Sequence, residues 1–340
     1  MYQALYRKYR PKKFCDVVSQ KHVVKTLINQ IKSKQISHAY LFCGSHGTGK
    51  TSIAKIFAMA LNCESNNDGE PCNKCHQCLN TKNKSNINII EIDAASNNSV
   101  DNIRDLCEEI KYPPVDNSRY KIYIIDEIHM LSSGAFNALL KTLEEPPKYI
   151  VFILATTEYK KIPTTIISRC QRYDFKKICD KDIFVSLKNI CEQEEIIIDY
   201  DALEYISEIN NGSLRDAISV LDRCSNLYRN KRINLKDILD FLSVLDFETC
   251  DRFINELENK NLSSALEIID SFIDSGKDSG DFIYSLIFYL YKSIKKDINN
   301  KNDIEFKSNI LENFVKLDSK LKYLINKRLA LDLLIIDLCE

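Results

Sequence analysis

The sequence lacks three features that would place the protein in a special class. Its 340 residues include no tryptophan, carry a formal net charge of -1 and contain no long hydrophobic run. The near-zero charge excludes a globally basic field, so any contact with nucleic acid must come from a local patch. The longest apolar run, Phe282–Tyr291, is far shorter than a membrane span. The basic N-terminus lacks the apolar core of a signal peptide, and a cytoplasmic protein is expected.

The composition is otherwise ordinary. Hydrophobic residues make up 44% and charged residues 28% of the chain, as in soluble globular proteins, and the length allows two or three domains. The missing tryptophan accompanies abundant isoleucine, lysine and asparagine, a pattern typical of AT-rich coding that says nothing about function. Thirteen cysteines do not predict disulfides in a cytoplasmic chain. Nine of them are scattered and are interpreted as small buried hydrophobic residues.

A strand followed by a glycine-rich turn and a helix is the strongest functional signal. The segment Ala39–Thr51 reads AYLFCGSHGTGKT and contains the G-x-x-x-x-G-K-T spacing of a phosphate-binding P-loop. Glycines let backbone N–H groups face one point, and the following helix adds the positive end of its dipole. Glycine-rich turns are common without nucleotide, but here the apolar strand and the amphipathic helix supply the required context. The predicted nucleotide-binding residues are Gly44, Ser45, His46, Gly47, Thr48, Gly49, Lys50, Thr51 and Ser52, with Lys50 on the outer phosphates and Thr51 on Mg²⁺.

A second apolar strand ends in two carboxylates. The run Ile122–Ile125 is continuously apolar, as expected for a strand buried in a parallel sheet, and Asp126 and Glu127 follow it. Ligands of such sheets bind at the carboxyl ends of the strands. Asp126 is therefore expected to hold Mg²⁺, and Glu127 to polarise the attacking water. A solvated acidic turn is the alternative, which the P-loop makes less favourable.

Four cysteines form a separate cluster. Cys63 lies at the expected end of the P-loop helix, and Cys72, Cys75 and Cys78 form two overlapping C-x-x-C pairs. Four thiolates suit a closed tetrahedral Zn²⁺ site, and the polar insert around them has little core of its own. A structural zinc module is therefore predicted at about residues 62–80. A ligand role for His76, an iron–sulfur cluster and unligated thiols are the alternatives.

Three further polar residues are candidates for the same site. The apolar strand Tyr149–Ala155 is followed by a threonine pair, from which Thr157 can reach the γ-phosphate or its water, although β-propensity alone also favours threonine there. Arg169 follows an apolar turn and is a candidate for projecting into a neighbouring subunit. Arg215 stands in the first turn of a helix, where a cation opposes the helix dipole, and is expected to bind an outside anion.

Other segments accompany these motifs and complete a recognisable series. They are YRKYRPKKFCDVVSQ at Tyr6–Gln20, EIDAASN at Glu91–Asn97, DEIHMLS at Asp126–Ser132, FNALLKTLEEPP at Phe136–Pro147, and the short motifs LATT, SRC and GSLRDA. With the P-loop and the four-cysteine insert, this series resembles the AAA+ clamp-loader ATPases of bacterial DNA polymerase III. The resemblance runs from the first residue to about Ser225 and continues more loosely to the C-terminus.

The resemblance implies roles for individual residues. Thr157 matches sensor 1, Arg215 matches sensor 2 acting in cis, and Arg169 matches a finger that completes a neighbour's site. A segment that packs around the adenine is matched by Arg10, Pro11, Val17 and Val18. The helix at about residues 99–110 resembles one that faces the DNA backbone, with Arg104 as its phosphate contact. Asn97 and Ser99 depart from the basic residues often found there.

The predicted fold is an α/β P-loop AAA+ ATPase domain with an inserted zinc module, followed by two α-helical domains. The ATPase domain is expected at 1–178, because strands and helices alternate there as in a doubly wound sheet. Apolar residues at helical spacing indicate a helical lid at 179–242 and a helical collar or oligomerisation domain at 243–340. Helix N-caps are expected at Asp201, Ser213 and Asn234. The chain ends at what resembles the end of the collar, so a shorter form without a tail is expected.

The resemblance also implies a function and its partners. The chain is expected to be the ATPase motor subunit that opens the sliding clamp and loads it onto primed DNA during replication, using ATP, Mg²⁺ and structural Zn²⁺. As an enzyme it would be a DNA-dependent ATP hydrolase within the DNA polymerase III holoenzyme, a nucleotidyltransferase complex. The implied partners are the clamp-loader subunits delta and delta', further copies of the chain, the sliding clamp (beta), primer–template DNA and accessory subunits linked to single-strand-binding protein. No membrane partner is expected.

Two other classes of protein share parts of this pattern. The D-E-x-H run at Asp126–His129 also occurs in helicases, which need two motor domains, whereas one P-loop domain is visible here. A non-hydrolysing structural subunit of the same ring would have a degraded P-loop, whereas every phosphate-handling residue is intact. Strand displacement by the chain alone, or no hydrolysis in any mixture, would indicate these alternatives.

Overall fold

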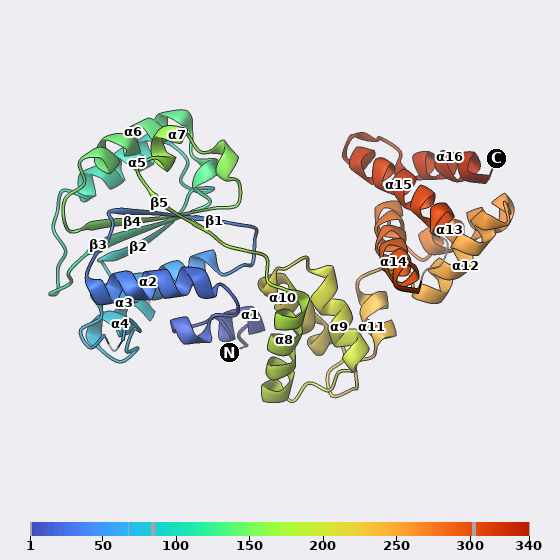
Figure 1. Cartoon of the computed structure of the whole chain (residues 1–340), viewed down its shortest axis with the longest axis horizontal. Helices are drawn as coiled ribbons and strands as arrows, with labels where there is room; N and C mark the ends of the chain where they lie inside the picture. Colours follow the sequence, from blue (N-terminus) through green and yellow to red (C-terminus); the bar gives the residue numbers. More distant parts are fainter. Residues whose placement is uncertain (1, 67, 83–85, 301–303, 340) are drawn as a thin grey trace. The chain divides into compact units, whose positions relative to one another are not determined.

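A computed structural model describes residues 2–66, 68–82, 86–300 and 304–339 of the chain. Two compact units make up the protein, Met1–Asn230 and Lys231–Glu340 (Figure 1). The first unit contains every residue that the sequence assigns to nucleotide or metal binding. Within the predicted insert at 62–80, Asn67 lies outside the described residues.

A five-stranded sheet forms the centre of the first unit. Its strands are β1 (Ala39–Cys43), β2 (Ile89–Asp93), β3 (Lys121–Asp126), β4 (Ile150–Thr156) and β5 (Gln171–Asp174). They lie in the order β2-β3-β4-β1-β5, and all neighbours are parallel, as predicted. The register pairs Cys43 with Thr156 and Asp93 with Asp126, so the carboxyl ends of β1, β3 and β4 meet at one edge. That edge carries the P-loop, the acidic pair and the threonine pair.

The inner strands β1, β3 and β4 are buried because helices cover both faces of the sheet (Figure 1). Helices α2 (Lys21–Ser33) and α3 (Lys50–Asn62) lie on one face, and α5 (Val100–Glu109), α6 (Ser133–Glu144) and α7 (Thr164–Ile167) lie on the other. Successive residues of a strand point to opposite faces, so Phe42 belongs to the core that contains Phe57 of α3, whereas Leu41 belongs to the core that contains Leu139 of α6. This alternation explains why β1 and β4 are apolar throughout.

Three helices after the sheet form the lid region, α8 (Asp180–Glu194), α9 (Tyr200–Ile209) and α10 (Leu214–Leu227). The short N-terminal helix α1 (Leu5–Lys8) packs on α10, where the buried Asp222 carboxylate accepts hydrogen bonds from the Leu5 N–H at 3.1 Å and the Tyr2 hydroxyl at 2.5 Å. The first residues of the chain are therefore anchored on the lid.

The helix caps agree with the sequence at two of three positions. Ser213 caps α10, and Asn234 caps α11 (Leu235–Phe241), each accepting a backbone N–H from the third residue of its helix. The expected cap at Asp201 is wrong, because α9 begins at Tyr200 and Asp199 holds the extended conformation of its N-cap. Asp201 lies in the first turn, where its charge favours the helix dipole.

The second unit is helical, as predicted. Its longer helices are α12 (Phe247–Glu258), α13 (Leu262–Asp274), α14 (Ser279–Asn300), α15 (Glu305–Lys320) and α16 (Lys327–Cys339). Their apolar faces form one core in which Phe282 contacts the rings of Phe253 and Phe272 edge-on, at centroid distances of 5.2 and 5.4 Å. Short elements complete the chain, namely α4 (His76–Lys82) and the 3₁₀ turns η1 (Phe14–Asp16), η2 (Ile128–Met130), η3 (Tyr159–Lys161) and η4 (Leu321–Tyr323). Of the helices in the described ranges, none is long and apolar enough to cross a membrane.

Candidate functional site

The P-loop leaves β1 through glycines that the backbone requires. Gly44, Gly47 and Gly49 all have positive φ, and the Gly44 N–H donates to the Thr156 carbonyl at 3.2 Å. Gly47 also lies against the lid, because a Cβ built on it would be 1.8 Å from the Ser213 Oγ and 3.1 Å from the Ser213 Cα. The N-terminus of α10 therefore lies directly on the phosphate-binding loop.

Lys50 lies inside this loop with its charge almost fully buried. The side chain is held by two backbone acceptors, since Nζ donates to the carbonyls of Gly44 at 2.7 Å and Ser45 at 2.8 Å. Burial lowers the pKa of Lys50, and the charges of Glu127 and Asp126 act against that shift. A buried cation at the first turn of a helix, beside glycine N–H groups, fits a polyphosphate.

Thr51 and Asp126 meet across the sheet edge. The Thr51 Oγ1 donates to Asp126 Oδ2 at 2.7 Å, and Asp126 Oδ1 accepts the Glu127 N–H at 3.1 Å. A hydroxyl and a carboxylate oxygen at this distance are hard ligands of the kind that Mg²⁺ prefers. The residues present thus fit a Mg²⁺–nucleotide complex.

Glu127 is held by the threonine that the sequence assigned as sensor 1. Its backbone has a positive φ of 48°, and its Oε2 accepts hydrogen bonds from the Thr157 N–H at 3.1 Å and the Thr157 Oγ1 at 2.9 Å. The side chain is therefore fixed to the end of β4. This arrangement joins the ends of β3 and β4 through one carboxylate.

Two histidines beside Glu127 were not expected from the sequence. The His129 Nδ1 is 3.2 Å from Glu127 Oε2 and 3.1 Å from the Thr156 Oγ1, while the exposed His46 ring lies 3.7 Å from Glu127 Oε1. His129 stands two residues after Glu127 in a 3₁₀ turn, which brings its ring back over the carboxylate. The D-E-x-H spacing was the available signal for this contact.

Arg10 and Arg215 converge on the P-loop helix from different parts of the chain. The Arg10 Nε donates to the Ser52 Oγ at 3.0 Å, and the Arg215 guanidinium lies 5.3 Å from the centroid of the Tyr6 ring. Burial lowers the pKa of Arg10, and the nearby Arg215 charge adds to that shift. Two neighbouring cations near the first turn of α3 suit an anionic ligand.

Arg169 lies elsewhere on the unit. Its guanidinium forms an ion pair with Glu144 of α6 at 2.7 Å and donates to the Thr165 carbonyl at 2.7 Å. The side chain remains one-third exposed, with a relative accessibility of 33%. Arg169 is thus held by residues of α6 and α7.

The residues at positions 10–18 that were assigned to the adenine do not all line one pocket. Val18 lines a pocket of about 480 Å³ together with Lys176 and residues of α8, whereas Arg10 contacts α3 as described. Val17 packs against the core of the α2–α3 face, and Pro11 is half-buried. The same segment ends at the buried Gln20, whose amide donates to the carbonyls of Lys176 at 2.6 Å and of Thr48 at 3.4 Å.

Helix α5 carries the predicted DNA contact. Arg104 is exposed and pairs with Asp101 at 3.4 Å on the same helix. Ser99 serves as the N-cap, accepting the Asn102 N–H at 3.2 Å, and Asn97 donates to the Asp93 carbonyl at 3.1 Å. The two positions that depart from basic residues are thus occupied by side chains that hold the start of the helix.

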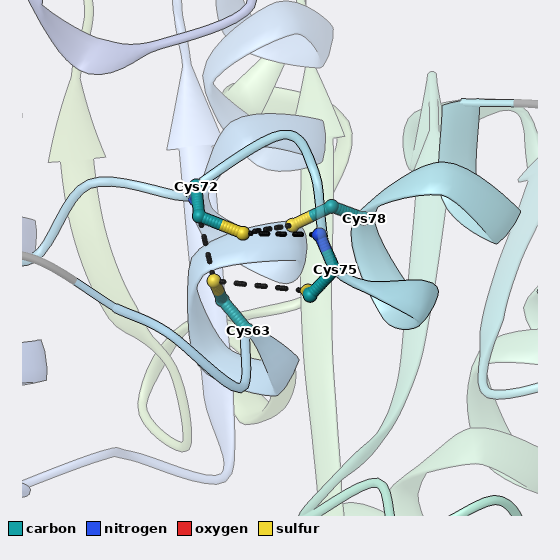
Figure 2. Close-up of side chains that lie close together, drawn as sticks. All are labelled: Cys63, Cys72, Cys75 and Cys78. Atoms are coloured by element: carbon teal, nitrogen blue, oxygen red, sulfur yellow. Dashed lines mark hydrogen bonds between the residues drawn. The ribbon is translucent and has the colours of Figure 1, made fainter.

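The four cysteines form a compact cluster (Figure 2). Their Sγ atoms all lie within 4.8 Å of one another, although Cys63 comes from the end of α3 and the others come from the loop before and the start of α4. Backbone N–H groups point at the sulfurs, from Cys72 to Cys63 Sγ at 3.3 Å and from Cys75 to Cys72 Sγ at 3.2 Å. Burial acts to raise the pKa of Cys72, but such N–H groups outweigh it and lower that pKa to about 6. The donor set fits Zn²⁺, while the exposed His76 contacts Asn80 and is not part of the cluster.

The chain is similar in sequence to known proteins of one family. Residues 19–179 match the family model "DNA polymerase III, delta subunit", and residues 182–224 match "DNA polymerase III clamp loader subunit, ATPase lid domain". The "DNA polymerase III subunit gamma" of Buchnera aphidicola subsp. Schizaphis graminum is 39% identical over 338 residues, which cover 95% of this chain and 91% of that protein. The chain belongs to the DNA polymerase III gamma/tau subunit family.

Other gamma/tau relatives are longer. The "DNA polymerase III subunit tau" of Bacillus subtilis is 48% identical over 297 residues, which cover 86% of this chain and 52% of that protein. The Mycoplasma genitalium "DNA polymerase III subunit gamma/tau" is 39% identical, with 51% of it covered. The chain thus spans about half the length of these two relatives.

Solved structures confirm the fold of this gamma/tau family member. The "RUVB HOLLIDAY JUNCTION BRANCH MIGRATION MOTOR" of Thermotoga maritima superposes with a TM-score of 0.51 at 16% identity, covering 87% of this chain and 99% of that one. The likeness supports the parallel α/β ATPase fold followed by helical regions.

The contact between the P-loop and the lid predicts different effects of alanine at two glycines. Gly47 (φ +68°) and Gly49 (φ +98°) both lie in the left-handed region. Alanine at either position should lower the free energy of unfolding of the protein by about 1–2 kcal/mol, because a Cβ is unfavourable there. Gly47→Ala should lose about 1–3 kcal/mol more, because its Cβ meets Ser213, whereas the Cβ of Gly49→Ala meets nothing within 4 Å. Thermal denaturation of the two variants measures the difference, and equal melting temperatures would contradict the described contact.

Proposed function

We propose that the chain is an ATPase motor subunit of the DNA polymerase III clamp loader, which opens the sliding clamp and loads it onto primed DNA. One observation carries the proposal. In a chain of the gamma/tau family, one sheet edge carries the buried Lys50, the hydrogen-bonded pair of Thr51 and Asp126, and the hydrogen-bonded pair of Glu127 and Thr157. A subunit that only binds its neighbours has no need of this set of groups.

The proposed nucleotide site uses side chains of the first unit only. The P-loop N–H groups and Lys50 bind the phosphates, and Thr51 with Asp126 would hold Mg²⁺, which neutralises phosphate charge when bound. Arg10 and Arg215, which approach each other beside α3, supply positive charge from the N-terminal segment and the lid. Val18 is proposed to contact the base, together with Pro11 and Val17.

Hydrolysis needs a base and a sensor of the terminal phosphate. We assign the base to Glu127, which would orient the attacking water, and the sensor to Thr157. In the structure the two side chains are hydrogen-bonded to each other, so Thr157 can exchange this bond for one to the phosphate and release Glu127 toward the water. Such an exchange would couple recognition of the γ-phosphate to activation of the base.

A neighbouring subunit is proposed to complete the site. Arg169 is partly exposed and is held by an ion pair with Glu144. We propose that it reaches the nucleotide of the next subunit in a ring, where a guanidinium stabilises charge in the transition state. The isolated chain should then hydrolyse ATP slowly.

The remaining assignments concern assembly. We propose an ATPase domain at 1–178, a lid at 179–242 and a collar at 243–340, with the collar joining the chain to further copies of itself and to the subunits delta and delta'. Helix α5, through Arg104, would face the backbone of primer–template DNA, and the assembled ring would hold the sliding clamp. Accessory subunits linked to single-strand-binding protein and a cytoplasmic location belong to the same proposal.

The proposed function predicts an ATPase that depends on its partners. The purified chain should turn over slowly alone, and the rate should rise strongly only with delta, delta', sliding clamp and primed DNA together. Lys50→Ala should abolish nucleotide binding, measured by calorimetric titration with ADP, because it removes the buried positive charge that lies inside the loop. Stimulation by single-stranded DNA alone would indicate a helicase-like motor, and no hydrolysis in any mixture would indicate a structural subunit.

The trans finger predicts a separation of binding from hydrolysis. Arg169→Ala should leave the affinity of the isolated chain for ADP unchanged and lower kcat of the assembled loader by about 10³-fold or more. Glu144→Gln is a useful companion, since it keeps Arg169 but removes the charge that orients it. Full DNA-stimulated turnover by Arg169→Ala would contradict the trans role.

We also propose that the four cysteines hold one structural Zn²⁺. Elemental analysis of the purified chain should find about one zinc per chain, and Cys72→Ser should lose the metal and lower the melting temperature. Cys15→Ser is the matched control, because Cys15 is an exposed thiol outside the cluster. A Cys72→Ser chain that retains its zinc would contradict this ligand set.

A further inference from the structure

The cysteine insert is attached to α3, the helix that carries the P-loop lysine, and to its neighbour α2. It begins at Cys63, the C-cap of the P-loop helix α3, and the Asn66 side chain donates to the Ala60 carbonyl of that helix at 2.9 Å. On the other side, Gly69 lies so close to α2 that a Cβ on it would be 2.9 Å from the Ile28 Cγ2. The insert is therefore packed into the first unit and does not project from it.

A third attachment reaches the N-terminal segment of the chain. The Glu70 carboxylate accepts the Phe14 N–H at 2.8 Å through Oε2 and the Cys15 N–H at 2.9 Å through Oε1. The Asn73 side chain adds a bond to the Lys12 carbonyl at 3.2 Å. Both carboxylate oxygens are thus used to hold one short backbone segment, and hydrogen bonds to an ionised acceptor are the stronger kind.

The segment held by Glu70 is the one that contacts the P-loop. We call residues 10–20 the N-terminal strap. Its first residue, Arg10, bonds to Ser52 of α3, and its last, Gln20, bonds to the Thr48 carbonyl within the loop. Between these ends the Phe14 ring is buried in the sheet core. Glu70 holds the middle of the strap, so its position determines how both ends approach the nucleotide site.

A metal in the cluster would fix Glu70. Only Pro71 separates Glu70 from Cys72, and the proline ring fixes φ at the intervening position. Cys72 is already joined to Cys63 by its own N–H, which donates to Cys63 Sγ at 3.3 Å, and a shared metal would add a second link between the two residues. Ordering the cluster therefore orders the Glu70 carboxylate, and through it the strap.

We propose that Glu70 is a positioning residue that couples the cysteine cluster to the nucleotide site, so that zinc binding and nucleotide binding strengthen each other. This inference rests on the proposed nucleotide and zinc sites. Coupling between two ligands is reciprocal, so the factor by which zinc improves nucleotide affinity equals the factor by which nucleotide improves zinc affinity. Glu70 makes no contact with either ligand in this scheme and acts only through the strap.

The test measures this coupling in the full chain. The dissociation constant of ADP with Mg²⁺ is measured by calorimetry for zinc-loaded and zinc-stripped protein, and that of zinc is measured by chelator competition with and without saturating ADP. We expect zinc to tighten ADP binding by about tenfold in the wild type. Glu70→Ala should bind ADP about tenfold more weakly than the wild type when zinc-loaded, and should show no coupling.

Two further variants distinguish positioning from folding. Glu64→Ala removes the same charge from an exposed position in the same insert and should keep the wild-type coupling. Glu70→Gln keeps one acceptor oxygen for the strap and should give an intermediate affinity for ADP. Melting temperatures and zinc content of each variant show that it is folded and loaded.

The possible outcomes separate this inference from the proposals beneath it. Equal ADP affinity of zinc-loaded Glu70→Ala and Glu64→Ala would overturn the role of Glu70, even where stripping the metal unfolds the chain. Zinc-independent ADP binding by a folded wild type would overturn the coupling. A wild-type chain that binds no ADP would contradict the proposed function itself, and one without zinc would contradict the metal site.

Discussion

The parallel register of β1, β3 and β4 is the constraint on which the rest of the molecule depends. Because β4 pairs with both of its neighbours, the chain segments that follow Cys43, Asp126 and Thr156 leave the sheet at one edge. The inner strands β1, β3 and β4 are buried along almost their whole length, so their charged side chains lie where the strands begin or end. The P-loop, the acidic pair and the threonine pair are therefore adjacent through hydrogen bonding of the backbone, with no sequence proximity needed.

The positive charges near this edge of the sheet favour the binding of an anion. Lys50 is buried against carbonyl oxygens, and the half-buried Arg10 lies near Arg215, so desolvation lowers the pKa of both Lys50 and Arg10. The carboxylates are arranged differently, since Asp126 faces Thr51 whereas Glu127 is bonded to Thr157. The two acidic neighbours thus occupy distinct positions that suit metal binding and water activation.

Parts of the chain outside the sheet supply the remaining walls of the site. The lid reaches the P-loop at Gly47, and Asp222 of the same lid anchors the first residues of the chain. The cysteine insert holds the N-terminal strap from the other side through Glu70. The lid and the N-terminal strap therefore contact the P-loop, and the cysteine insert contacts the strap. Each of these three regions can influence nucleotide binding.

The sequence by itself determined the elements and the chemistry. Apolar runs located the buried strands, glycine and lysine spacing located the P-loop, and the two C-x-x-C pairs located the cysteine cluster, because each depends on residues close together in the chain. Only the tertiary structure decided which distant residues meet: the His46 ring at Glu127, the Ser213 contact with Gly47 and the Glu70 bonds to the strap. Such contacts join backbone and side-chain atoms across long separations, and no local pattern specifies them.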